Sequence, residues 1–571
     1  MKLMDLIKRL LSTLPAIALS TLVFLNGLTP LFAQEVNGGA DLTKDITGGA
    51  AGVLKIPRVN KPHRTIPVGV SQFQNAHQGS GSVRGGGGSK QLVSHKPPPP
   101  KPTADDFNNK GNDLFDKGQY DQAIEAYNQA IRLRPNFAEA YNSIGDAYFN
   151  LKSYDKAITA YKNAINYKPN WADPYNGLGD AFFNQKLYNE AVNPYQQTVR
   201  LNPKAASAYY NLGYIYFGMN KDADSISAFK EAIKLDPKDW EAYNYLGKAY
   251  DRQKQYDMAV DAYRQVAQLN PTIAADAYYS EAAALYNAGR YEESIAAYNQ
   301  ALKLKTDFPD IYSNIGDAHL KLNKYSEAAD NYKHAVILKQ ADADTYKNLG
   351  YVSLKLSRYT DAISAYKTAL SLKSDLPNLE EVYDNLGYAL GKTKNWPEAI
   401  EDFKKAMSIK SDDVDAYTNL SWAYNQTGHF NDGADAARQA VRINPNYPAA
   451  QFNLGFASSK LNNFKDAAVA FKEATRTKPD WAEAYNNLGF AYGNLKQWKD
   501  AIEAHKQAIR IKPDYAGAIY NLGVEYFQNG NKNEAMDQYR ILQKMNPTLA
   551  DNLYFIMNKR LPSQAGGNKS Y

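Results

Sequence analysis

The chain has 571 residues, 44% of them hydrophobic, and it contains no cysteine. The missing cysteine excludes disulfides, thiolate metal sites and a thiol nucleophile. The formal net charge is +6 and is unevenly distributed: residues 1–103 hold 12 Lys and Arg against 4 Asp and Glu, while the rest hold 54 against 56. The long C-terminal part is therefore almost neutral, and its charge does not indicate a nucleic-acid partner.

Residues 1–33 have the pattern of an export signal. Lys2, Lys8 and Arg9 precede an apolar run that ends at Ala33. A basic start before an apolar stretch is typical of secretory signals, and Ala33 suits the position before a cut. The run is also long enough to span a bilayer as an anchor. We predict a signal peptide or signal anchor, favour cleavage, and place the rest of the chain in a bacterial periplasm, envelope or exterior. Membrane contact is expected only through this segment, if it stays uncleaved.

Residues 34–103 form a second region that is rich in glycine, proline and basic residues. It includes the runs Gly85 to Gly88 and Pro97 to Pro100. Glycine runs behave as flexible coil and a proline run as a short stiff spacer. We predict a disordered basic linker. Its charge would suit an anionic lipid or polymer, and a soluble tether is the simpler interpretation.

Residues 104–549 repeat one 34-residue unit thirteen times; one copy reads AEAYNNLGFAYGNLKQWKDAIEAHKQAIRIKPDY, from Ala482 to Tyr515. Each unit has two segments with apolar residues at helical spacing, separated by a turn and closed near a proline. The eighth position is glycine in eleven units. Glycine inside a helix costs about 1 kcal/mol relative to alanine, so its recurrence indicates a second helix that passes very close. The twentieth position supplies a matching small residue, such as Ala123 or Ala501.

This pattern resembles the tetratricopeptide repeat (TPR) family. The resemblance implies an all-α fold, a right-handed superhelical TPR solenoid of about thirteen helix-turn-helix repeats whose concave face is lined by the first helix of each pair. Residues 550–560 are expected to form a C-terminal capping helix and 561–571 a flexible tail. Departures from the pattern include Ser421 in place of glycine and three extra residues at 377–379. We expect a bend or softer joint at that insertion.

The sixth position of the unit is the strongest candidate for ligand contact. It is asparagine in seven successive units: Asn314, Asn348, Asn385, Asn419, Asn453, Asn487 and Asn521. An amide side chain can donate to and accept from the backbone of an extended peptide. The row resembles the asparagine ladder in the repeats of O-linked N-acetylglucosamine transferase. The competing interpretation is that these amides satisfy polar groups between neighbouring units.

The ninth position becomes aromatic in the later units. Its residues there are Tyr351, Tyr388, Trp422, Phe456 and Phe490. Aromatic rings that face a groove can stack on prolines, apolar side chains or sugar rings. Together with the asparagines they make residues 343–524 the predicted contact surface.

No catalytic or metal-binding pattern accompanies the repeats. The seven histidines are scattered without ligand spacing, and Gly85 to Gly88 lacks the strand and helix that flank a phosphate loop. Too few residues follow the repeats for the sugar-transfer domain of the resembling transferases. The two-unit clamp for chaperone C-termini is absent as well, because Tyr351 and Asp415 occupy two of its positions. We therefore expect neither enzyme activity nor a cofactor.

The prediction that follows is an exported scaffold that binds extended protein segments in its concave groove and serves in the assembly of envelope complexes. Two alternatives stay open at this point. The groove aromatics could bind carbohydrate or cell wall, with a polysaccharide as partner. The chain could also be a non-catalytic targeting subunit of an enzyme. Proteins or peptides are the expected partners, and nucleic acid is not.

Overall fold

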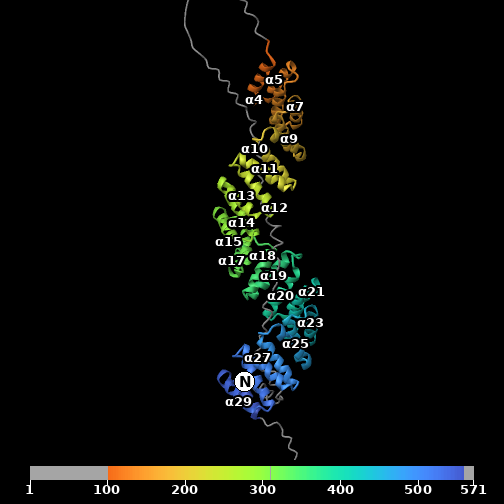
Figure 1. Cartoon of the computed structure of the whole chain (residues 1–571), viewed down its shortest axis with the longest axis vertical. Helices are drawn as coiled ribbons and strands as arrows, with labels where there is room; N and C mark the ends of the chain where they lie inside the picture. The colour runs from red at the N-terminus through yellow and green to blue at the C-terminus, as the bar shows by residue number, and fades with distance from the viewer. Residues whose placement is uncertain (1–100, 309, 559–571) are drawn as a thin grey trace, which may run out of the picture. The chain divides into compact units, whose positions relative to one another are not determined.

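The structure is a computed structural model that describes residues 101–308 and 310–558. The predicted signal at 1–33, residues 34–100 of the predicted linker and the predicted tail at 561–571 lie outside the described residues. Throughout those two ranges the regular elements are helices, and none of them is a strand. Figure 1 shows these helices following one another in chain order. None of the described helices combines the length and apolarity needed to cross a membrane.

The described residues fall into two compact units, one ending at Ile311 and the other starting at Tyr312. We call them the N-terminal and the C-terminal unit. The N-terminal unit contains α4 (Ala104–Asp116), α5 (Tyr120–Leu133), α6 (Ala138–Asn150), α7 (Tyr154–Tyr167), α8 (Ala172–Asn184), α9 (Tyr188–Leu201), α10 (Ala206–Gly218), α11 (Asp222–Leu235), α12 (Trp240–Arg252), α13 (Tyr256–Leu269), the short 3-10 helix η2 (Pro271–Ile273), α14 (Ala274–Asn287) and α15 (Tyr291–Leu304).

The C-terminal unit begins with α16 (Ile311–Lys321), whose first residue lies at the boundary. It continues with α17 (Tyr325–Ile337), α18 (Ala343–Lys355), α19 (Tyr359–Leu372), α20 (Leu379–Lys392), α21 (Trp396–Ile409), α22 (Val414–Gln426), α23 (Phe430–Ile443), α24 (Pro448–Lys460), α25 (Phe464–Thr477), α26 (Ala482–Asn494), α27 (Trp498–Ile511), α28 (Ala516–Gln528), α29 (Lys532–Met545) and α30 (Pro547–Asn558). Helices α4 to α29 thus make thirteen pairs, as the repeat predicted.

The turn inside each pair uses one conformation. The fifteenth position of the unit has a positive φ in all thirteen pairs, and only Gly118, Gly289, Gly428 and Gly530 among these residues are glycine. Lysine, asparagine or serine occupies the others. A left-handed residue ends the first helix by satisfying its last carbonyl groups. Lys152, for example, has a φ of 56° and donates its backbone N–H to the carbonyl of Phe149 at 2.8 Å.

In most units the glycine at the eighth position faces an aromatic ring of the second helix, whereas Gly523 faces Leu553 of α30. A Cβ on Gly145 would lie 2.5 Å from Cε1 of Tyr161, and one on Gly455 would lie 2.8 Å from Cδ1 of Phe471. The close approach predicted from the glycines is therefore present, but the group that requires it is the ring at the twenty-fourth position. Small residues at the twentieth position, such as Ala157, are fully buried beside it.

Helix α30 covers the end of the C-terminal unit. It begins at Pro547, three residues earlier than the predicted capping helix. Its residues Leu549, Ala550 and Leu553 are buried in one cluster with Ile519 and Leu542. This covers apolar side chains of α28 and α29 that a further repeat would otherwise bury.

Candidate functional site

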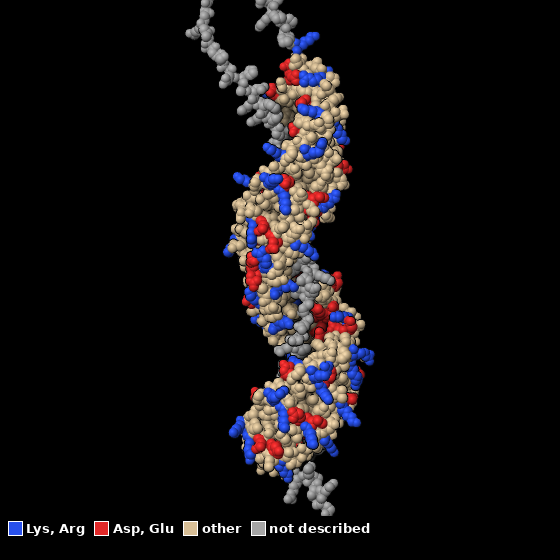
Figure 2. Space-filling model, in the orientation of Figure 1, with Lys and Arg blue, Asp and Glu red and all other residues tan. Residues whose placement is uncertain are grey.

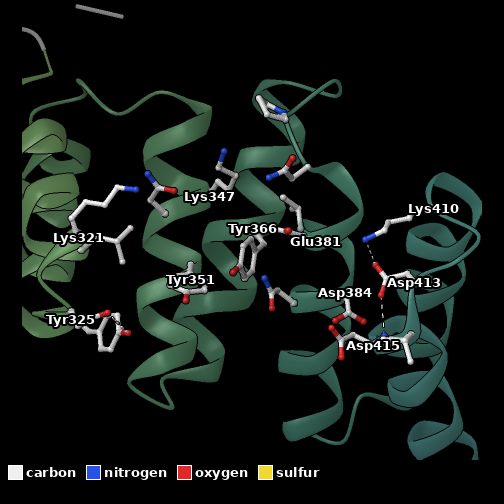
Figure 3. Close-up of a pocket in the computed structure, with 18 of the residues that line it drawn as sticks. Lys321, Tyr325, Lys347, Tyr351, Tyr366, Glu381, Asp384, Lys410, Asp413 and Asp415 are labelled. Atoms are coloured by element: carbon white, nitrogen blue, oxygen red, sulfur yellow. Dashed lines mark hydrogen bonds and ion pairs between the residues drawn. The ribbon is translucent and has the colours of Figure 1, made fainter. Parts of the chain in front are cut away.

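The C-terminal unit contains a pocket of about 410 Å³. Its lining comes from the first helices of four successive pairs, α16, α18, α20 and α22, with additional residues from α17, α19 and the turns before α20 and α22. Figure 3 shows these side chains converging from the neighbouring helices. A site on the first helices agrees with the face that the family resemblance predicted for ligands.

Three of the predicted site residues meet in this pocket: Asn348, Tyr351 and Asn385. Each of them is half-buried. Tyr366 of α19 joins them; its side chain is 1% exposed, and its buried hydroxyl has no hydrogen-bond partner. Burial raises the pKa of Tyr366 well above its usual value, and the nearby Asn385 opposes the rise. The pocket thus presents a buried hydroxyl and two amides to a ligand.

The other predicted asparagines are engaged within the protein. The Nδ2 of Asn419 donates to both carboxylate oxygens of Asp384, at 3.1 and 3.0 Å. The Nδ2 of Asn453 donates to the carbonyl of Thr418 at 3.0 Å, and that of Asn521 to Oδ1 of Asn486 at 3.0 Å.

Each of these bonds reaches back to the preceding repeat, as does the bond from Asn348 to Asp317 at 2.9 Å. For these four residues, the side-chain amide therefore connects neighbouring repeats, as the competing interpretation predicted. Asn487 is buried and its Nδ2 has no partner, while Asn314 is half-buried. Neither Asn314 nor Asn487 is among the residues that line the pocket.

Four of the five predicted groove aromatics pack against rings of a neighbouring repeat. Trp422 is 4% exposed and meets Trp396 edge-on, with ring centroids 5.0 Å apart. Tyr388 lies against Trp422 at 5.9 Å. Half-buried Phe456 and Phe490 meet the rings of Phe430 and Phe464 at 6.4 and 6.2 Å. Only Tyr351 of the five lines the pocket. The expected open stacking surface thus does not include Trp422, because its ring is buried between two repeats.

One side of the pocket is acidic. The residues that make it so are Glu381, Asp384, Asp412, Asp413 and Asp415. Burial raises the pKa of Asp384 to about 8; the hydrogen bond from Asn419 opposes this rise, and the charges of Asp413, Asp415 and Glu381 add to it. Burial also raises the pKa values of Glu381 and Asp415.

Fewer cations than acids line the pocket. They are Lys321, Lys347 and Lys410. Lys410 lies 3.7 Å from Asp413, and Lys347 pairs at 2.8 Å with Asp344, which is not part of the lining. Figure 3 shows Asp384, Asp413 and Asp415 close together at one end and Lys321 at the other. By contrast, Figure 2 shows basic and acidic side chains interspersed over the face in view.

One sequence feature indicated this pocket, namely the insertion at which we expect only a bend or softer joint. The three extra residues at 377–379 precede α20, and two of them, Pro377 and Asn378, line the pocket. Asn378, the residue before α20, has a left-handed φ of 54°, and Asp310 before α16 shares this conformation with a φ of 66°. The two compact units divide at 311/312, so the insertion lies within one unit and not at that division. The acidic residues at 412–415 were not predicted as a group.

No group of three or more His, Asp or Glu side chains in the part of the chain that the structure describes has the arrangement of a metal site. The pocket offers charged and hydrogen-bonding side chains for recognition of a ligand.

Comparison with protein families covers most of the repeat region. Profiles described as TPR repeat match residues 111–152, 145–186, 179–220, 213–254 and 282–323. Profiles described as tetratricopeptide repeat match residues 240–273, 309–342, 342–412, 418–480, 482–515 and 516–549. The chain belongs to the tetratricopeptide repeat family. The TPR array is thus a scaffold of a kind that binds proteins, built from the hairpins described above.

Several solved TPR structures are similar to parts of this array. The MamA protein is 30% identical over 29% of this chain and 91% of its own, with a TM-score of 0.28. YrrB, titled a TPR protein with an unusual peptide-binding site, is 20% identical over 32% of this chain and 94% of its own, with a TM-score of 0.31. The APC/C hetero-tetramer Cut9-Hcn1 gives 15% identity, 80% and 96% coverage and a TM-score of 0.36. A comparison with curated proteins gives no match.

Proposed function

We propose that this TPR array is an exported scaffold that binds an extended protein segment in the pocket of its C-terminal unit. The observation that carries the proposal is the pocket itself, lined by four successive first helices and containing the Tyr366 hydroxyl without a partner. A pocket that crosses several repeats suits a ligand in extended conformation, because successive repeats contact successive parts of it. Each polar contact is worth about 0.5–1.5 kcal/mol, so several are needed for useful affinity.

The supporting residues are Asn348, Tyr351 and Asn385, which the sequence had nominated and which meet in the pocket. Asn419, Asn453 and Asn521 instead bond to the preceding repeat and so contribute to the stacking of repeats. The carbohydrate alternative has less support, because Trp422 is buried between repeats. A role as targeting subunit of an enzyme would use the same pocket.

An array of extended peptides, probed with the full chain, tests the proposal. The variant Tyr351→Ala/Asn385→Ala should lose at least tenfold in affinity for the peptides that the unaltered chain retains. The matched control is Tyr214→Ala/Asn211→Ala, which changes the ninth and sixth positions of a repeat in the N-terminal unit. Equal losses in both variants, at unchanged thermal stability, would refute the pocket as the binding site.

Export is the second part of the proposal and rests on Lys2, Lys8, Arg9 and the apolar run to Ala33. Cell fractionation and N-terminal sequencing of the native protein test it. We expect the chain in the envelope or outside the cell, beginning at Gln34 if the signal is cleaved. A cytoplasmic chain would contradict export and leave the pocket proposal to stand on its own test.

A further inference from the structure

The pocket has an excess of acid that its own cations do not balance. Five carboxyl groups line it, and Asp384, with its pKa raised to about 8, is mostly protonated at neutral pH. The other four face three lysines, and one of those lysines, Lys347, pairs with Asp344 outside the lining. Burial is the main cause of the raised pKa of Asp384, and the charges of Asp413, Asp415 and Glu381 raise it further. Carboxylates that share a poorly solvated space gain most from a cation placed among them.

The arrangement also supplies hydrogen-bond acceptors for such a cation. The Tyr366 hydroxyl is buried, faces the pocket and has no partner. Asn385 lines the pocket next to Asp384 in α20. An ammonium or guanidinium group needs several acceptors when it leaves water, and a hydroxyl, an amide oxygen and carboxylates together can provide them.

The chain itself contains a segment with the matching charge. Residues 46–104 include no Asp or Glu, and within them Lys55, Arg58, Lys61 and Arg64 recur at every third position. Pro57 and Pro62 lie between these cations. A polyproline II backbone repeats every three residues, so this spacing would put all four cations on one edge of a bound segment, about 9 Å apart.

We propose that the acidic pocket of the C-terminal unit binds the chain's own basic segment, residues 53–66. The proposal rests on the proposed function to the extent that both use this pocket for an extended segment. The segment follows the expected cleavage point, so it stays in the exported chain. The 36 residues between Ile66 and Thr103 can extend to about 120 Å. In the chain without a partner, the segment then occupies the pocket, and a partner protein must displace it in order to bind there.

The test measures binding of a fluorescent peptide of residues 52–67 by anisotropy. The acceptor is the full chain with Lys55, Arg58, Lys61 and Arg64 replaced by Gln, so that its own segment no longer competes. This acceptor should bind the peptide at least tenfold more tightly than the unaltered chain does. Binding should weaken with rising salt, because the contact is between charges.

Two acceptor variants locate the site. Glu381→Gln/Asp412→Asn in the same background should lose at least tenfold in affinity. Asp514→Asn is the matched control, because Asp514 has the same place before α28 as Asp412 has before α22. It is exposed and is not among the pocket residues, so affinity should not change. A second peptide with the four cations replaced by Gln should not bind.

The inference is overturned if the pocket double variant binds the peptide as tightly as the Asp514→Asn control, or if the uncharged peptide binds equally well. It is also overturned if the acceptor binds no more tightly than the unaltered chain. The outcome is separable from that of the proposed function. If array peptides bind in a way that depends on Tyr351 and Asn385 while the 52–67 peptide does not bind, only this inference is refuted. If neither the array peptides nor the 52–67 peptide bind, the inference and the proposed function are both refuted.

Discussion

At the scale of single residues, the same repeat position has different roles in different units. Asn419 and Asn453 tie their repeats to the preceding one, whereas Asn385 lines the pocket. Their positions in the repeat are identical, so the difference comes from the group that each side chain meets in the preceding repeat. Asn419 meets the buried carboxyl group of Asp384, and Asn453 meets the carbonyl of Thr418. A row in sequence is therefore not by itself a binding ladder.

His505 is the residue at which a single change should have the largest effect on acid stability. It occupies the twenty-fourth position, is fully buried against Gly489, and neither ring nitrogen has a partner. Burial lowers its pKa from 6.5 to about 3. The folded chain therefore keeps His505 neutral where the unfolded chain protonates it, and this stability is present above pH 6.5 and lost as pH falls toward 3.

Replacing His505 by Phe, the residue found at the same position as Phe471, should remove that loss. We expect the variant to gain about 2–3 kcal/mol at pH 4.5. Urea denaturation of this variant and the unaltered chain at pH 4.5 and 7.5 checks it. A gain that does not grow toward acid pH would show that His505 is protonated in the folded chain.

At the scale of the helix pair, the eighth and twenty-fourth positions act together. Most pairs combine glycine with Tyr or Phe, as Gly455 does with Phe471. The pair α22/α23 instead combines Ser421 with Ala437, both fully buried. The Oγ of Ser421 donates to the carbonyl of Gly433 at 2.7 Å. The loss of glycine at Ser421 is thus accompanied by loss of the ring that required it.

This coupling predicts a non-additive pair of substitutions. Ala437→Phe alone should destabilise the C-terminal unit by about 1–3 kcal/mol, because the ring would overlap Ser421. Adding Ser421→Gly should recover at least half of that loss, although Ser421→Gly alone is destabilising. Denaturation midpoints of the four proteins give the coupling energy.

The reverse exchange serves as the control. Gly455→Ser should destabilise through contact with Phe471, and Phe471→Ala in the same chain should relieve that contact. Strictly additive effects in both pairs would contradict the coupling.

At the scale of the whole molecule, buried carboxyl groups recur in both units. Burial raises the pKa of Asp146 to about 7, of Asp180, Asp251 and Asp317 to about 6, and of Glu525 to about 8. In several cases a tyrosine hydroxyl donates to the acid, as Tyr161 does to Asp146 at 2.8 Å. The folded chain therefore binds more protons than the unfolded chain between about pH 4 and pH 8.

The array should for this reason lose stability as pH rises through that window. Asp146→Asn tests one contribution, because Asn112 already forms the equivalent bond with Tyr127 at 2.9 Å in the preceding repeat. The variant's stability relative to the unaltered chain should increase by about 2–3 kcal/mol between pH 5 and pH 8.5. Thermal or urea unfolding at the two pH values measures this; an unchanged difference would mean that Asp146 is ionised throughout.

The sequence alone determined the architecture. A 34-residue period, glycine at the eighth position and a small residue at the twentieth are local constraints, and each repeats often enough to specify a helix pair that must stack on its neighbours. Helices α4 to α29 follow from that argument, whereas the location of a ligand site on the first helices was implied only by the resemblance to the TPR family. The helix pairs and their stacking depend on contacts within one repeat or between adjacent repeats, and a periodic sequence specifies such contacts.

Only the tertiary structure decided which members of a periodic row are available to a ligand. Asn385 and Tyr351 line the pocket, while Asn419 and Trp422 serve contacts between repeats, although the period treats them alike. The acids Asp412, Asp413 and Asp415 line the same pocket as Glu381 and the inserted residues Pro377 and Asn378. The side chains of this site come from several repeats, so their proximity depends on how the helices pack in three dimensions.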